Sequence, residues 1–194
     1  CEAFVSFRSH AAIYRRRDGF LAPGDIRHVM WSLAKNEHKA LLKDRLNGIS
    51  TGNAVLIEHI RRFGVEAGIE AMGKAVLKPG CRVIPVTAQS VILRAILESG
   101  RRIAYEHKIG DRSDYKDRIR GVFLDPPAKP AEGVIESILE ADLIVLGPGS
   151  LFTSIMPNLM VQGVSEALSQ TKAKVVLITS LVTDRETYGY NAAN

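Results

Sequence analysis

Two short apolar runs near the end of this 194-residue chain give its clearest hydrophobic pattern. Residues 143–146 are apolar without a break, and residues 174–179 form a second such run. Continuous apolar runs of this length favour strands that are buried on both faces. Between them, apolar residues at helical spacing predict a helix over residues 158–170. Strand, helix and strand in this order predict a parallel pair with a right-handed crossover.

The rest of the pattern adds helices and a group of alternating strands. Apolar positions at helical spacing predict helices over residues 26–34, 38–46, 54–62, 65–77 and 132–140. Strands are predicted over residues 81–87, 91–97, 101–109 and 118–124, with a hairpin turn at Ser99-Gly100. The chain is therefore predicted to be α/β: one domain over residues 1–194, with a Rossmann-like three-layer parallel sheet and a small antiparallel β excursion over residues 91–124.

The loop after residues 143–146 carries the most distinctive chemistry. Gly147-Pro148-Gly149-Ser150 lies at the carboxyl end of a predicted parallel strand, where open α/β sheets bind ligands. The glycines let main chain approach a ligand closely, and the N–H groups that follow can converge on one anion. Hydroxyl groups add further donors. The predicted phosphate site consists of Gly147, Gly149, Ser150, Thr153 and Ser154.

This loop matches neither of two widespread phosphate-binding motifs. It lacks the Gly-Lys-Ser/Thr of a Walker A loop, and Phe152 stands where a dinucleotide fingerprint has its third glycine. Two interpretations therefore stay open. The loop is either a phosphate or carboxylate site, or an ordinary strand-to-helix turn in which glycine supplies curvature and Ser or Thr caps the helix.

Polar residues at the ends of other predicted elements are further candidates. Asp25 precedes a helix, so it either caps that helix or faces a ligand or metal. Gly52-Asn53 is an unusual helix start unless main chain approaches another group there. Thr87 stands at the end of a predicted strand.

The segment of residues 183–190 follows the second apolar run. Because parallel strands end at one sheet edge, we expect it to emerge beside the glycine loop. Asp184 and Glu186 are candidates for binding a metal or a sugar hydroxyl, and Tyr188 and Tyr190 for stacking on a ring. The alternative is a polar loop without a ligand.

Composition narrows the class of partner. The net charge of +5 favours anionic ligands, and no aromatic interleaving supports a nucleic-acid surface. No run approaches the roughly 20 apolar residues of a membrane helix. The chain's two cysteines form no disulfide framework and suit a reducing cytoplasm.

Together these stretches resemble the CofD/YvcK family, which contains the phospholactate transferase of coenzyme F420 synthesis and the bacterial gluconeogenesis factors. The resemblance is carried by residues 23–27, Gly52-Asn53, and residues 83–87, 146–159 and 186–190. The long motif over residues 146–159 is closest to the gluconeogenesis-factor branch.

The resemblance implies a Rossmann-like fold with a phosphate-bearing ligand at the strand ends. In the gluconeogenesis-factor branch the ligand is a UDP-sugar, and the role is regulation of carbon metabolism and cell shape. By this analogy Asp25 and Asn53 line the pocket. In the transferase branch a phospholactyl group passes to a deazaflavin with Mg²⁺, for which Asp25 and Asp184 are the candidate ligands.

Two features of the family are missing from the sequence, a glycine-rich turn near its start and the Asp-Asp-Gly stretch that follows it. The family opens with a strand and a Gly-Gly-Gly-Thr-Gly turn, so we expect this chain to be a fragment that lacks that turn. Three hypotheses follow: a regulator that binds a nucleotide diphosphate sugar, with Thr87 meeting ligand polar groups; a Mg²⁺-dependent transferase; and an inactive truncated remnant. Whether the chain is catalytic or forms a homo-oligomer stays open.

Overall fold

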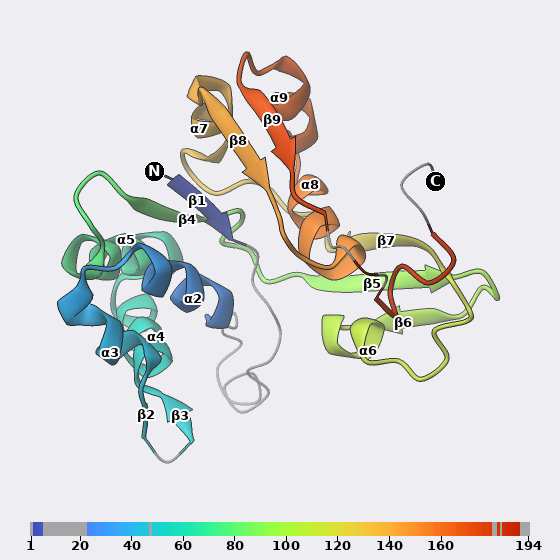
Figure 1. Cartoon of the computed structure of the whole chain (residues 1–194), viewed down its shortest axis with the longest axis horizontal. Helices are drawn as coiled ribbons and strands as arrows, with labels where there is room; N and C mark the ends of the chain where they lie inside the picture. Colours follow the sequence, from blue (N-terminus) through green and yellow to red (C-terminus); the bar gives the residue numbers. More distant parts are fainter. Residues whose placement is uncertain (1, 6–22, 47, 180–181, 183, 191–194) are drawn as a thin grey trace. The chain divides into compact units, whose positions relative to one another are not determined.

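The computed structural model describes residues 2–5, 23–46, 48–179, 182 and 184–190 (Figure 1). Its contacts divide the chain into two compact units, each with its own hydrophobic core. Unit 1 is Cys1–Ser90 with Ala131–Val134, and unit 2 is Val91–Pro130 with Ile135–Asn194. The single domain over residues 1–194 stays a prediction.

Unit 1 is a group of helices beside a parallel strand pair. Its elements are β1 (Glu2–Val5), α2 (Gly24–Leu33), the 3₁₀ turn η1 (Asn36–His38), α3 (Lys39–Lys43), β2 (Arg45–Leu46), β3 (Ile49–Ser50), α4 (Thr51–Phe63), α5 (Val65–Val76) and β4 (Arg82–Pro85). β1 pairs with β4 in parallel, and β2 forms a short antiparallel hairpin with β3. The core includes Met30, Leu42, Leu56, Ile69 and Met72. The apolar positions at helical spacing in α2 and α5 therefore face this core.

The helix predicted over residues 38–46 is wrong at its end. The helix α3 stops at Lys43, because Asp44 has extended main chain (ψ 155°). Arg45 then pairs with Ser50 across the hairpin. The helix predicted from residue 54 begins earlier, at Thr51, because the Ser50 hydroxyl accepts a hydrogen bond from the Asn53 amide (3.4 Å) and caps it.

Unit 2 contains an antiparallel sheet and a parallel pair. Its elements are β5 (Ile92–Leu97), β6 (Arg102–Ala104), α6 (Glu106–Gly110), β7 (Ile119–Asp125), α7 (Val134–Glu140, which begins in unit 1), β8 (Leu143–Leu146), the π-helical turn η2 (Leu151–Ile155), α8 (Met156–Leu159), α9 (Val164–Gln170) and β9 (Lys174–Leu177). The sheet order is β6-β5-β7, and β8 pairs with β9 in parallel. The α/β class with a small antiparallel excursion is confirmed.

Two predicted elements of unit 2 are interrupted in the structure. The strand predicted over residues 101–109 ends at Ala104, because Tyr105 has a left-handed φ of 76° and leads into α6. The helix predicted over residues 158–170 is broken between α8 and α9, where Gly163 has a left-handed φ of 80°. Local main-chain geometry therefore overrides the hydrophobic period at both places.

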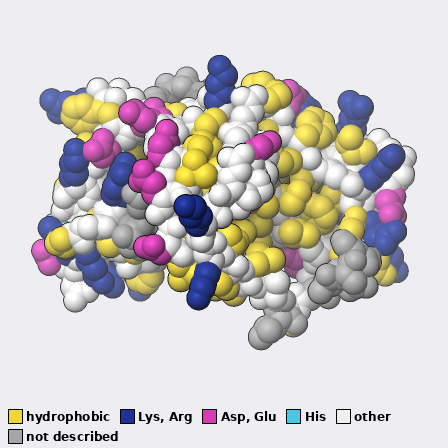
Figure 2. Space-filling view, turned by 90° about the horizontal axis from the view of Figure 1, so that it is seen from above, with side chains coloured by type: hydrophobic (Ala, Val, Ile, Leu, Met, Phe, Trp, Pro, Cys, Tyr) yellow, Lys and Arg dark blue, Asp and Glu magenta, His cyan; other side chains and the backbone are white. Residues whose placement is uncertain are grey.

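The prediction that β8 and β9 are buried on both faces is wrong. Helices α7 and α9 lie beside the pair (Figure 1), yet Leu143 is 57% exposed and Val176 is 46% exposed. Among the described strands, β8 and β9 pair only with each other, so no further strand continues this sheet. Seen from above the view of Figure 1, hydrophobic side chains form part of the visible surface (Figure 2). Within the described ranges, no helix is long and apolar enough to cross a membrane.

Candidate functional site

The glycine loop after β8 is held tightly by its own neighbours. Gly147 has a left-handed φ of 86°, and a Cβ there would lie 2.6 Å from the carbonyl oxygen of Ile178. A Cβ at Gly149 would lie 2.9 Å from the Cβ of Ser154. Both glycines are therefore required by the turn itself, whether or not a ligand binds there.

The main chain after these glycines forms the π-helical turn η2. The amides of Ser154 and Ile155 both donate to the carbonyl oxygen of Ser150, at 2.9 and 3.1 Å. By contrast, the four amides from Gly149 to Phe152 have no acceptor among the residues that the structure describes. Gly147 and Pro148 are exposed, and Gly149 and Ser150 are half-buried, so solvent reaches this loop. Turns of this π-helical kind occur frequently at functional sites.

The donors of Thr153 are already used inside the protein. Its amide donates to Oε2 of Glu186 (3.1 Å), and its hydroxyl donates to Oε1 of the same carboxylate (2.6 Å). Both side chains are buried. Burial raises the pKa of Glu186, and the charge of Asp184 adds to this, while the hydrogen bonds from Thr153 oppose it. The Glu186 side chain therefore already accepts the hydrogen bond of one amide of the predicted phosphate loop, that of Thr153.

The carboxylate of Asp184 holds the start of the segment of residues 184–190. Its Oδ1 accepts from the Thr187 amide (2.9 Å) and hydroxyl (2.8 Å), and its side chain also hydrogen-bonds with Ser150. Burial favours a higher pKa for Asp184, but these hydrogen bonds outweigh burial and bring the pKa below its ordinary value. The segment is therefore tied to the glycine loop, as the predicted shared sheet edge requires.

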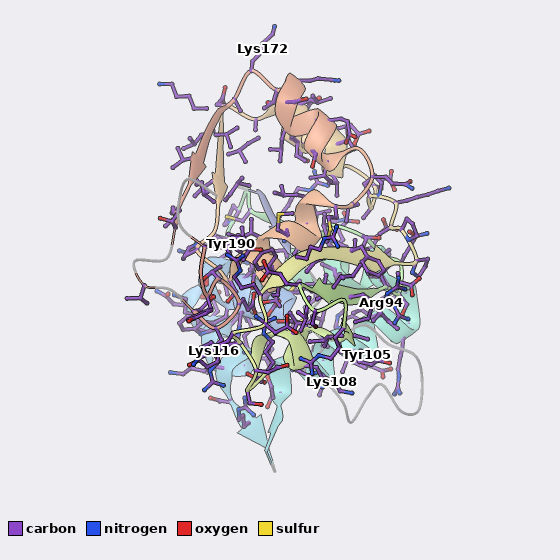
Figure 3. All side chains as sticks on the ribbon, turned by 90° about the vertical axis from the view of Figure 1, so that its right-hand side faces the viewer. Arg94, Tyr105, Lys108, Lys116, Lys172 and Tyr190 are labelled. Carbon is purple, nitrogen blue, oxygen red and sulfur yellow. The ribbon has the colours of Figure 1, made fainter. Side chains whose placement is uncertain are left out.

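The two tyrosines of this segment lie in different environments. Tyr190 donates its hydroxyl hydrogen bond to the Ile119 carbonyl and packs edge-on against Phe152, with ring centroids 5.5 Å apart. It lies among crowded side chains in Figure 3, whereas Lys172 projects outward from the turn before β9. Tyr188 is 41% exposed and contacts Tyr115 edge-on. Tyr188 is therefore the more accessible of the two to a ligand ring, while Tyr190 is half-buried and packs against the core of unit 2.

Arg112 is a buried residue that sequence reasoning missed. It is 6% exposed, and its Nη2 donates to the carbonyls of Tyr115 and Arg185, both at 3.3 Å. Its Nε and Nη1 have no hydrogen-bond partner among the residues that the structure describes. Burial lowers the pKa of Arg112, while the charges of Asp117 and Glu186 raise it. In the sequence it stands within a run of mixed charges that is typical of a solvated surface, so no local signal marked it.

Two of the candidates of unit 1, Asp25 and Asn53, lie in the first turns of α2 and α4. Asn53 accepts a hydrogen bond at Oδ1 from Nε of Arg27 (2.9 Å). Asp25 is the second residue of α2 rather than its N-cap. Thr87 is buried, and its hydroxyl accepts from the Gln89 amide (3.2 Å). Whether these residues meet the ligand stays a prediction.

The Mg²⁺ implied by the transferase resemblance needs acidic ligands close together. Within the described part of the chain, no group of three or more His, Cys, Asp or Glu side chains could hold a metal ion. Asp25 and Asp184 belong to different units. Whether the chain binds Mg²⁺ therefore stays a prediction.

Replacing Asp184 by asparagine should lower the free energy of unfolding at pH 7 by about 1 kcal/mol, because charged hydrogen bonds become neutral ones. A carboxylate whose folded pKa is lowered contributes stability above its unfolded pKa of about 3.9 and loses it as pH falls through the folded pKa. Urea unfolding at pH 7 and near pH 3 should therefore show the difference shrinking in acid. The exposed Asp142→Asn variant is the control, and equal effects of the two substitutions at pH 7 would contradict the assignment.

The family model and the relatives that match this chain agree on one family. The family model described as "2-phospho-L-lactate transferase CofD" matches residues 8–194. A protein named "Gluconeogenesis factor" from Halalkalibacterium halodurans is 37% identical over 183 residues, which are 89% of this chain and 56% of that protein. Its namesake from Bacillus subtilis is 38% identical over the same shares of both chains. The chain thus spans a little over half the length of these relatives.

A solved structure is also closely similar. The crystal structure of a UPF0052 family member from Bacillus halodurans superposes with a TM-score of 0.89 at 33% identity. The match covers 99% of this chain and 65% of that one. At this identity the likeness supports the fold and the shared ancestry together.

Proposed function

The chain belongs to the CofD family, and we propose that it binds the diphosphate of a nucleotide sugar, such as a UDP-sugar, through the loop from Gly147 to Ser154. The observation that carries the proposal is that the amides from Gly149 to Phe152 have no acceptor among the described residues and follow the carboxyl end of a parallel strand. Gly149 and Ser150 at the start of this stretch are half-buried. The next amide, that of Thr153, is already bound to Glu186, so the proposal concerns the four amides before it.

The names of the relatives suggest the role of such binding. Relatives called gluconeogenesis factor favour a regulator of carbon metabolism over an enzyme, and the family resemblance extends that role to cell shape. A regulator of this kind acts in the cytoplasm, where we place the chain. Its partner is then the nucleotide sugar rather than nucleic acid or membrane.

Replacing Leu151 by proline tests the amides directly. Leu151 is the first residue of η2, a position that tolerates proline, and Ser150 already has the extended main chain (φ −60°, ψ 134°) that precedes proline. The substitution therefore removes one N–H with little strain. Loss of a hydrogen bond to a phosphate should weaken binding of UDP-N-acetylglucosamine at least tenfold in a calorimetric titration.

The matched control is Leu151→Ala, which loses the same side chain but keeps the amide. Equal affinities of the two variants would remove the loop amides from the proposal. A wild-type chain that gives no heat with UDP-N-acetylglucosamine would refute the nucleotide-sugar assignment itself. Substituting Gly149 is a poorer test, because its Cβ would strike Ser154 and disturb the turn.

A second candidate is transfer of a phospholactyl-type group to a deazaflavin, because the matching family model is described as a 2-phospho-L-lactate transferase. Such a reaction depends on positioning and charge neutralisation, with Mg²⁺ as the added cation. Turnover that requires Mg²⁺ would favour this candidate. Binding of the nucleotide sugar without turnover would favour the regulator.

A further inference from the structure

The carboxylate of Glu186 has a closely fitted place at the end of the glycine loop. Glu186 is 4% exposed, and its two oxygens accept hydrogen bonds from the amide (3.1 Å) and the hydroxyl (2.6 Å) of Thr153. At the end of α6, a Cβ on Gly110 would lie only 3.0 Å from Oε1 of Glu186. Glycine at this position therefore leaves room for the carboxylate. All three residues belong to unit 2.

The hydrogen bonds of Glu186 suit a charged carboxylate. Both of its oxygens accept, whereas a protonated acid would turn one of them into a donor. Arg112 is a nearby cation, because its Nη2 donates to the carbonyl of the preceding residue, Arg185 (3.3 Å). Among the described residues, however, no ion pair joins Arg112 to Glu186, and Nε and Nη1 of Arg112 have no hydrogen-bond partner there. The charge of Glu186 is therefore not cancelled by a direct contact.

A second carboxylate contacts the same loop. The side chain of Asp184 hydrogen-bonds with Ser150, and its Oδ1 also accepts from the Thr187 amide (2.9 Å) and hydroxyl (2.8 Å). The two acids therefore meet the loop at Ser150 and at Thr153. These positions lie within and directly after the four amides, from Gly149 to Phe152, that have no described acceptor. An anion bound to those amides is consequently close to two negative charges.

Such a loop distinguishes phosphates by their charge. The main-chain amides offer the same donors to every phosphate, but the repulsion from a fixed carboxylate grows in proportion to the charge of the bound anion. A terminal phosphate carries about −1.5 to −2 charges at pH 7, because its second pKa is near 6. A phosphate that is substituted on both sides, as in the diphosphate of a nucleotide sugar, has no second proton to lose and carries one charge. The carboxylates therefore penalise the terminal phosphate more.

We propose that Glu186 is a specificity-determining residue, whose carboxylate, together with that of Asp184, makes the glycine loop select singly charged phosphates over terminal phosphates. This inference rests on the proposed function for the presence of a phosphate ligand. It adds the class of ligand, a diphosphate substituted at both ends rather than a nucleoside diphosphate or triphosphate. It also gives Glu186 a role that requires no contact with the ligand.

The decisive variant is Glu186→Gln, which removes the charge and keeps a side chain of the same shape. UDP-N-acetylglucosamine and UDP are each titrated into the wild type and the variant by calorimetry, without divalent cations. We expect both ligands to bind the variant more tightly, with UDP gaining at least about threefold more than the nucleotide sugar. Contacts to the sugar cancel in this ratio, because they are the same in both proteins. A residue that only anchors the segment of residues 184–190 would instead weaken both ligands equally.

Asp142→Asn is the charge-matched control, because exposed Asp142 precedes β8, whose four residues separate it from the loop. At about 3.3 Å per residue they span about 13 Å, beyond the Debye length of about 8 Å at physiological salt. The ratio of the two affinities should therefore stay unchanged in this control. A shift as large as that of Glu186→Gln would overturn the proposal.

The two levels of inference fail in different ways. If the wild type binds UDP-N-acetylglucosamine but the ratio moves less than about threefold in Glu186→Gln, only the selectivity by charge is refuted. If the wild type binds neither ligand, the proposed function fails, and the selectivity fails with it.

Discussion

Replacing Gly68 by alanine is expected to lower the free energy of unfolding by about 2 kcal/mol. Its Cβ would lie 2.7 Å from main-chain atoms of His59 and Ile60, where α5 crosses α4. Overpacking costs about 1–3 kcal/mol, and main-chain atoms cannot move aside as a side chain can. The higher helix propensity of alanine offsets only up to about 1 kcal/mol of this. Urea unfolding followed by circular dichroism measures the effect.

Gly73 supplies the matched control in the same helix. A Cβ there would contact only the flexible side chain of Leu77, at 3.3 Å. Gly73→Ala should therefore be neutral or should stabilise by up to about 1 kcal/mol. Equal stabilities of the two variants would contradict the close crossing of α4 and α5. A truncated remnant that does not fold would show no cooperative transition in the wild type or in either variant.

Replacing Glu186 by alanine should cost about 2 kcal/mol of stability at pH 7. The substitution leaves the buried amide and hydroxyl of Thr153 without an acceptor and releases the segment of residues 184–190 from η2. An unsatisfied buried donor costs about 1–3 kcal/mol, part of which is offset because the buried negative charge is also removed. Chemical unfolding of the two proteins side by side gives the difference.

Glu186→Gln is the informative companion, because an amide can accept from one Thr153 group and donate to its hydroxyl oxygen. We expect it to cost less than about 1 kcal/mol. The raised pKa of Glu186 means that its contribution to stability is fully present below the unfolded pKa and falls as pH rises through the folded pKa. The neutral glutamine copies the protonated acid and should not show that fall. If both substitutions are neutral, the carboxylate does not anchor the segment.

The glycine loop illustrates how far sequence reasoning reached at the candidate site. Its position between a strand and a helical turn, and its neighbourhood with Asp184, were predicted from the apolar runs and from the geometry of parallel strands. The partner of Thr153 could not be predicted, because Glu186 is 33 residues away and its contact depends on how the segment folds back. Arg112 was missed for the same reason: only tertiary contacts distinguish a buried arginine from a solvated one.

The sequence by itself determined the α/β class, the buried faces of α2 and α5, the antiparallel excursion and the place of the glycine loop. Each of these depends on periodicity or turn chemistry within a short stretch, where side-chain spacing and main-chain preference act locally. Only the tertiary structure decided that β8 and β9 keep an exposed apolar face, that Glu186 accepts from the Thr153 amide, and that Arg27 donates to Asn53. Those outcomes depend on which distant groups share a buried space, because burial and hydrogen-bond partners are set by residues far away along the chain.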